Sequence, residues 1–177
     1  MPDPYARLRP PAPTPEAELC PMPFASPVKL MSALGFNPVH CMDCHLEVPP
    51  EALALPPSVV EELAQWASVH SAIEQLWLDS GAYERWAVHE LADLSSLVNR
   101  NGLAARAAVA PYRECYYWVF QDESVPSFAP LTRCPGCQER LRPYAGSVIP
   151  QMVCDTCGIV TVGVGPRGAG HGHASKA

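Results

Sequence analysis

The sequence is poor in charge, and it lacks the basic excess of a polyanion-binding protein. Charged residues make up 17% of the 177 residues, whereas about 25% is typical of globular chains. The 12 basic residues are outnumbered by 18 acidic ones, which gives a net charge of −6 and a pI of about 5.4. This balance excludes a strongly basic nucleic-acid-binding protein, so any nucleic-acid contact requires a local basic patch.

Long apolar segments are also missing. No apolar run approaches the ~18 residues that identify a membrane-spanning helix. The first 15 residues lack the apolar core of a secretory signal peptide, so we expect a cytoplasmic protein that does not contact a membrane. Because 48% of the residues are hydrophobic, the chain can still form a core, and its length fits one domain with tails.

The motifs of several common enzyme classes are absent. The sequence contains no Gly-rich phosphate loop, no GxSxG nucleophile turn and no HExxH zinc motif. Its CxxC pairs are not preceded by the His-x-Glu that a zinc deaminase uses. We therefore predict a protein that is not an enzyme, with no small-molecule substrate evident.

Proline, by contrast, is abundant and concentrated at the N-terminus. Nine of the 21 prolines lie in the first 27 residues. Because proline restricts φ and has no amide hydrogen, we predict that residues 1–29 form a disordered, extended arm. The Gly- and His-rich residues 164–177 predict a disordered tail. Between them we expect a single α+β domain over about residues 30–163.

The 30–130 portion is predicted to be mainly helical. Apolar residues recur every three or four positions in two runs, over residues 59–77 and 83–98, as expected for two helices with one buried face each. Asn101-Gly102 would end the second helix, because this pair is typical of helix C-termini. Residues 103–110 would then add a short third helix. An aromatic strand over 115–120 would follow, since its residues favour extended structure.

The strongest motif is a pair of CxxC turns near the C-terminus. Cys134 and Cys137 are separated by 16 residues from Cys154 and Cys157. Two such turns can place four thiolates at the corners of a tetrahedron, and this separation lies in the window of about 15–20 residues known for zinc sites. Disulfides are the alternative, but a chain without an export signal should stay reduced. We therefore predict a zinc ribbon over 131–163 with a structural zinc ion.

A third CxxC pair, Cys41-Met-Asp-Cys44-His45, is harder to interpret. It matches the motif for c-type haem attachment, but that modification requires export, which the N-terminus does not predict. Two interpretations stay open: two reduced cysteines buried at a turn, or half of a tentative second zinc site. The residues considered as further ligands of that second site are His40, His45, Cys115 and Cys20.

The order of several segments resembles that of a known family. These segments are Pro38–Cys44, Trp66, Tyr83–Ala87, Cys115–Val119 and the terminal double CxxC. Together they resemble the uncharacterised bacterial family of zinc-ribbon-containing proteins to which nucleic-acid binding is ascribed. The similarity covers roughly residues 38–162, and it implies that the four C-terminal cysteines are zinc ligands and that Cys41 and Cys44 form an added site. One departure is Gln138, where such a ribbon often has glycine.

Two classes of function remain open. A nucleic-acid-binding ribbon would use Arg133, Arg140 and Arg142 as phosphate contacts, but residues 131–163 carry a net charge of only +1. Neutralising about six phosphates takes about six cations. Residues 41–110 hold ten acids and three arginines, a net charge of −7, which favours a protein partner. We therefore predict a protein-interaction adaptor, with a nucleic-acid-binding zinc ribbon as the alternative.

Overall fold

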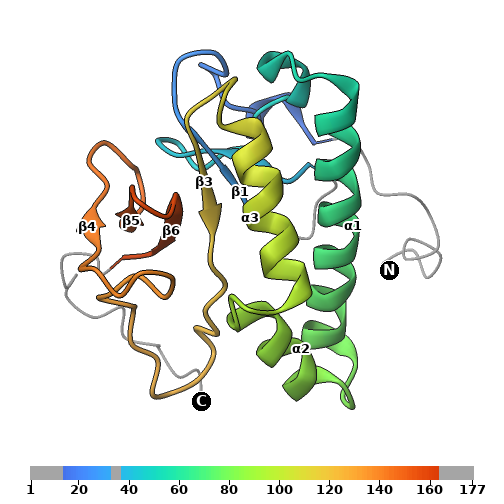
Figure 1. Ribbon diagram of the computed structural model, residues 1–177, viewed down its shortest axis with the longest axis vertical. Coiled ribbons are helices and arrows are strands. Elements are labelled where there is room, and N and C mark those ends of the chain that lie inside the picture. The colour runs from blue at the N-terminus through green and yellow to red at the C-terminus, as the bar shows by residue number, and fades with distance from the viewer. Residues whose placement is uncertain (1–13, 33–36, 164–177) are drawn as a thin grey trace, which may run out of the picture.

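One mixed six-stranded sheet runs through the computed structural model, which describes residues 14–32 and 37–163 (Figure 1). The predicted tail over 164–177 and the first 13 residues of the predicted arm lie outside the described residues. Together with three α-helices, the sheet confirms the predicted α+β class. The strands lie in the order β2-β1-β3-β6-β5-β4, with bounds β1 Val28–Leu30, β2 Val39–Cys41, β3 Cys115–Trp118, β4 Arg142–Pro143, β5 Gln151–Cys154 and β6 Ile159–Val162.

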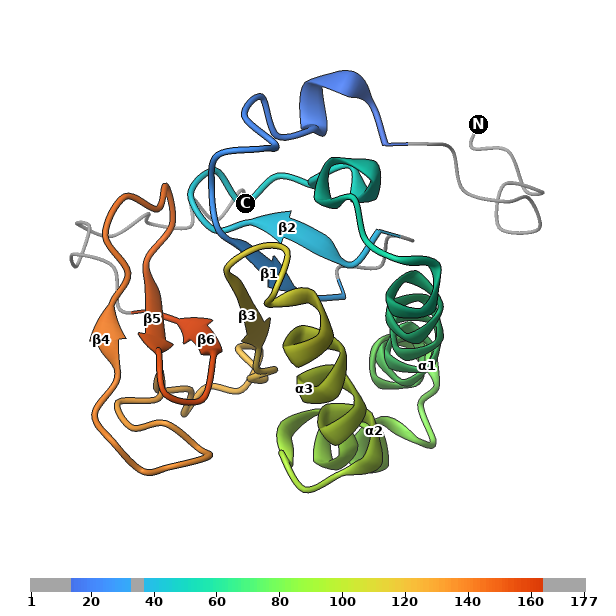
Figure 2. The ribbon, with the colours of Figure 1, turned by 45° about the horizontal axis from the view of Figure 1, so that its top comes forward.

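The strand order joins the two ends of the described chain into one sheet. Strand β1 pairs antiparallel with β2 and parallel with β3, and β3 also pairs parallel with β6. Strands β6, β5 and β4 form an antiparallel meander (Figure 2). The region predicted as a ribbon is therefore continuous with the rest of the sheet, and β3 is the strand that connects the two halves.

The helices cover one face of the sheet beside β1 and β3 (Figures 1 and 2). Their bounds are α1 Pro57–Asp79, α2 Glu84–Ala92 and α3 Leu97–Val109, and two short 3₁₀ helices span Glu16–Glu18 (η2) and Pro50–Leu53 (η3). Alternate strand residues such as Val28, Leu30 and Tyr117 are fully buried in the core that also contains Trp66 and Leu91 of the helices. None of the helices in the described ranges is long and apolar enough to cross a membrane.

The predicted helix stop at Asn101-Gly102 is wrong, because both residues lie inside α3. A Cβ atom at Gly102 would lie 2.3 Å from Cε2 of Tyr117 and 2.7 Å from Nε1 of Trp66. The glycine therefore serves close packing and does not terminate a helix. The residues predicted as a short third helix, 103–110, are the second half of α3 and the residue that follows it.

The chain instead breaks between α2 and α3, at a turn made by short polar side chains. The Asp93 carboxylate accepts hydrogen bonds from the Ser95 amide and hydroxyl, both at 2.8 Å. The Ser96 hydroxyl then caps α3 by accepting from the Asn99 amide at 3.3 Å. Aspartate and serine compete well for backbone amides at such positions, which explains why α2 ends at Ala92.

Residues 14–29 differ from the prediction of a disordered arm. They include η2 and the start of β1. Strand β1 pairs with β2 on one side and with β3 on the other. The Cys20 amide donates to the Glu47 carbonyl at 2.7 Å, and Arg113 donates to the carbonyls of Pro23 and Ser26, each at 3.2 Å. Prolines remove amide donors from this segment but leave its carbonyls free to accept, and distant residues provide the partners.

Candidate metal centres

Four cysteines of the C-terminal region meet at one point. The sulfur atoms of Cys134, Cys137, Cys154 and Cys157 all lie within 4.8 Å of one another, and those of Cys137 and Cys154 are 3.6 Å apart. Zinc bonds of about 2.3 Å in a tetrahedron separate the sulfurs by about 3.8 Å. The donor set therefore fits a tetrahedral metal ion, and the predicted four-residue cluster forms in the folded chain.

The first CxxC turn has the backbone geometry of a metal-binding knuckle. The Gln138 amide donates to the Cys134 carbonyl at 2.9 Å, and the Cys134 amide donates to the Glu139 carbonyl at 2.8 Å. Burial opposes ionisation of Cys134, but hydrogen bonds from the amides of Cys137 and Gly136 outweigh it and lower the pKa of this thiol. Gln138 has φ 64°, a left-handed conformation that glycine adopts without strain, which explains why glycine is common at this position.

The second turn of the cluster follows the same pattern. Gly158 comes directly after Cys157 and has φ 63°. Burial is the main cause that raises the pKa of both Cys154 and Cys157, and the neighbouring sulfurs raise it further. These two thiols resist ionisation until a cation offsets the repulsion between the sulfurs. The cluster thus has the electrostatics of a cation site.

The early CxxC turn repeats this geometry. The His45 amide donates to the Cys41 carbonyl at 3.1 Å, and the Cys41 amide donates to the Leu46 carbonyl at 2.9 Å. His45 has φ 65°, as Gln138 has 64° at the same place in its turn. Burial of Cys41 is again outweighed by hydrogen bonds, here from the amides of Cys44 and Asp43, so that its pKa is lowered. This match favours a metal-binding knuckle over two incidental buried cysteines.

Cys20 is the residue that joins Cys41 and Cys44. The three sulfurs lie within 4.8 Å of one another, and among the described residues no fourth cysteine, histidine or carboxylate belongs to the group. Burial raises the pKa of Cys20 to about 12. The sequence offers Cys20 only as one of several candidates, because it lies in the proline-rich segment that is predicted to be disordered. Its only signal in the sequence is that it is a cysteine, because it lies 21 residues before Cys41.

The other three candidates for the second site lie elsewhere. His40 precedes Cys41 in β2 and pairs with Lys29 of β1, so its side chain is on the opposite face of the sheet from Cys41. The His45 ring forms a hydrogen bond through Nδ1 with Nζ of Lys29 at 2.5 Å. Cys115 is buried in β3, with its sulfur 3.7 Å from the Tyr116 carbonyl. None of the three contributes a donor atom to the cluster.

We predict that the protein binds two zinc ions per chain. The Cys20→Ser variant should bind one, because the second site then retains only two thiolates, whereas Cys115→Ser should still bind two. Native mass spectrometry of the zinc-loaded proteins, with elemental analysis, measures the stoichiometry. One zinc per wild-type chain would contradict the second site.

The three arginines considered for phosphate contacts are all exposed, but they are not equally free. Arg142 forms a bidentate ion pair with Asp155, in which Nε and Nη2 lie 2.5 and 2.6 Å from the two carboxylate oxygens. The Tyr116 hydroxyl donates to the same carboxylate at 2.9 Å. Arg133 donates to the Gln138 carbonyl at 3.0 Å, and Arg140 is exposed on the same turn. The pairing of Arg142 reduces the positive charge that this surface offers to a phosphate backbone.

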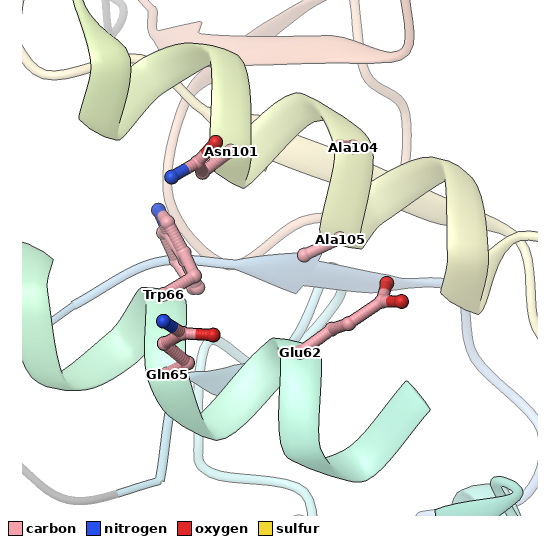
Figure 3. Close-up of a pocket in the computed structure, with 6 residues that line it drawn as sticks. All are labelled: Glu62, Gln65, Trp66, Asn101, Ala104 and Ala105. Atoms are coloured by element: carbon pink, nitrogen blue, oxygen red, sulfur yellow. The ribbon is translucent and has the colours of Figure 1, made fainter. Parts of the chain in front are cut away.

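A further pocket lies away from both cysteine clusters, between α1 and α3 (Figure 3). It has a volume of about 350 Å³, and the Trp66 side chain reaches from α1 toward Asn101 on α3. Glu62 and Gln65 line the α1 side, and two alanines line the α3 side. The pocket contains no cysteine or histidine, so it is separate from the candidate metal chemistry.

Comparisons of the chain with protein-family models, with curated proteins and with solved structures found no match. The resemblance to the zinc-ribbon family therefore stays a prediction.

Proposed function

We propose that this protein is a non-enzymatic, zinc-binding adaptor that docks a protein partner on its helices. One observation carries the proposal: an apolar pocket of about 350 Å³ formed by Leu76 of α1, Tyr83 of the α1–α2 turn and Trp86 of α2. The Tyr83 and Trp86 side chains are 60% and 48% exposed. Exposed tyrosine and tryptophan beside a pocket are typical of the residues that dominate protein–protein binding.

The charge around the pocket indicates which partner fits. Residues 57–98 contain seven acidic residues and one arginine, a net charge of −6. Asp79 and Glu84 are exposed and lie next to the pocket in the sequence. We propose that the partner presents an apolar side chain flanked by lysines or arginines. Complementary charge of this kind would accelerate association and orient the partner.

The zinc ion of the C-terminal cluster would act as a structural support in this proposal. Four thiolates fill the coordination sphere of a zinc ion in the C-terminal cluster, so that ion would have no free position for a substrate. The sheet that the ion supports is also the surface against which α1 and α3 pack. Metal binding would therefore hold the C-terminal strands on the sheet that carries the helices.

The experiment compares proteins retained from a nuclease-treated native-cell extract by the wild-type chain, by Tyr83→Ala/Trp86→Ala and by Tyr112→Ala. Tyr112 is a matched control, because it is 47% exposed and follows the end of α3 that is remote from α2. We expect the wild type and Tyr112→Ala to retain one protein in similar amounts. The double variant should retain at least tenfold less of that protein. A partner retained equally by all three would contradict this docking site.

The alternative function has its own test. A nucleic-acid-binding ribbon should bind DNA or RNA most strongly at about 50 mM salt, where the electrostatic contribution is large. If the protein binds DNA or RNA at this salt concentration and Arg133→Ala or Arg140→Ala weakens the binding, the result would support the alternative and count against the adaptor. We expect no binding, because of the Arg142–Asp155 pair and the acidic helices.

A further inference from the structure

We infer that the three-cysteine cluster is an open metal site, in which the metal ion keeps one exchangeable position that accepts a neutral nitrogen donor such as an imidazole. The observation behind this inference is the unequal number of ligands in the two clusters. The C-terminal cluster brings together four sulfurs, whereas Cys20, Cys41 and Cys44 bring together three. Zinc sites with three protein ligands hold water or another ligand in the fourth position.

His45, an alternative ligand that follows Cys44 directly, is held by other contacts. Lys29 is fully buried, and its Nζ lies 2.5 Å from both Nδ1 of His45 and Oε1 of Gln151. The Gln151 amide in turn donates to the Met42 carbonyl at 2.8 Å. These contacts hold the His45 ring beside Trp118, with ring centroids 5.9 Å apart. His45 therefore belongs to a buried polar cluster that joins β1 to β5, which separates it from the three sulfurs.

A cavity adjoins one of the three ligands, Cys20. Cys20 lines a cavity of about 490 Å³ whose other walls include Leu19, Pro21, Leu46 and Pro49. The largely apolar walls suit a flat, uncharged ring. Glu16 lies at the same cavity and would disfavour an anionic ligand. The pocket thus fits a neutral donor of the size of an imidazole.

The charge of the cluster points to the same class of ligand. Three thiolates and one Zn²⁺ sum to −1. Burial lowers the pKa of Lys29 to about 7, so this side chain does not supply a full compensating positive charge. A fourth thiolate would bring the site to −2 in a place where Cys20 and Cys41 are buried. A neutral imidazole adds no charge, so it avoids the cost of burying another anion.

The binding step is a simple ligand exchange. The lone pair of a neutral imidazole nitrogen forms a bond to the metal ion, and the bond between the metal and a water molecule breaks. No electron is transferred, and no proton needs to leave the ligand. The imidazole can come from a small molecule or from a histidine side chain of another protein, and the coordination chemistry is the same.

Cobalt substitution tests the inference on the full-length chain. Co²⁺ bound to thiolates has visible d–d bands that depend on the fourth ligand. Free imidazole should shift these bands in the wild type with saturation at one imidazole per chain. Cys20→Ser, which keeps the closed four-cysteine cluster, should show no shift. An unchanged wild-type spectrum at saturating imidazole would overturn the inference.

X-ray absorption of the zinc-loaded chain gives an independent measurement that needs no variant. We expect an average of about 3.5 sulfur ligands per zinc, as four-sulfur and three-sulfur sites in equal amounts require. An average of four would overturn the inference.

Two further arms identify the source of the donor. A histidine-containing peptide that reproduces the imidazole shift would show that a protein side chain can occupy the position. The sequence also holds His171 and His173. If His171→Ala/His173→Ala alters the cobalt spectrum in the absence of imidazole, the chain itself supplies the fourth ligand, and the inference of an exchangeable position is wrong.

Discussion

Complete removal of metal from the four-cysteine cluster is expected to unfold the C-terminal hairpins and to weaken the sheet as far as β3. Structural zinc sites contribute on the order of 10 kcal/mol to folding, which equals the whole stability of many domains. Strand β6 begins two residues after Cys157 and pairs with β3, so loss of the metal removes a neighbour from the central strand. The Cys154→Ser variant should show part of the same effect, because it leaves three thiolates where the wild type has four.

Hydrogen exchange of the metal-loaded and chelator-treated proteins measures this effect strand by strand. We expect protection to fall at least a hundredfold in β5 and β6 and by a smaller factor in β3, while α1 stays protected. Val148→Ser is a suitable control. Val148 lies between β4 and β5, is 71% exposed and belongs to neither cysteine cluster. Unchanged stability after complete metal removal would refute a structural metal in this cluster.

The Gly102→Ala variant is expected to lose about 2–3 kcal/mol of unfolding free energy, although alanine is the better helix former. The added methyl group would overlap the ring of Tyr117 and approach the Trp66 indole. Tyr117 cannot move away easily, because it is fully buried and its hydroxyl donates to Oδ1 of Asn99 at 2.6 Å. The clash therefore has to be relieved by separating α3 from β3.

Urea unfolding of the zinc-loaded proteins measures this loss, with Ala107→Gly as the matched control. Ala107 is exposed on α3, so replacing it with glycine should cost about 1 kcal/mol through helix propensity alone. The protein should be more stable with alanine than with glycine at residue 107. At residue 102 the order should be reversed. If Gly102→Ala is as stable as the wild type, the close packing of α3 on Tyr117 is wrong.

Features that depend on neighbouring residues could be predicted from the sequence. The spacing within Cys134–Cys137 and Cys154–Cys157 is local, because a CxxC turn directs both sulfurs to one side by its own backbone geometry. Apolar periodicity likewise located α1 and most of α2. The boundary between α2 and α3 was predicted in the wrong place. Glycine is typical of helix ends, but Gly102 lies inside α3 because the helix packs closely on Tyr117 there.

Features that depend on distant residues could not be predicted. The proline count of residues 1–29 indicates an extended chain, and β1 is indeed extended. Whether such a segment is disordered or forms a strand depends on partners far away, and here β3 lies almost 90 residues further along the chain. Another distant contact, between the Cys20 amide and the Glu47 carbonyl, accompanies the approach of Cys20 to Cys41 and Cys44. No local pattern contains that information.

The sequence by itself thus determined the α+β class and which four C-terminal cysteines could share a metal ion. Each follows from short-range geometry that a few consecutive residues set on their own. Only the tertiary structure decided that Cys20 completes a three-sulfur cluster, that the C-terminal hairpins share a sheet with β1, and that Arg142 is paired with Asp155. These depend on non-local pairing, whose closure entropy is repaid only when the whole core forms.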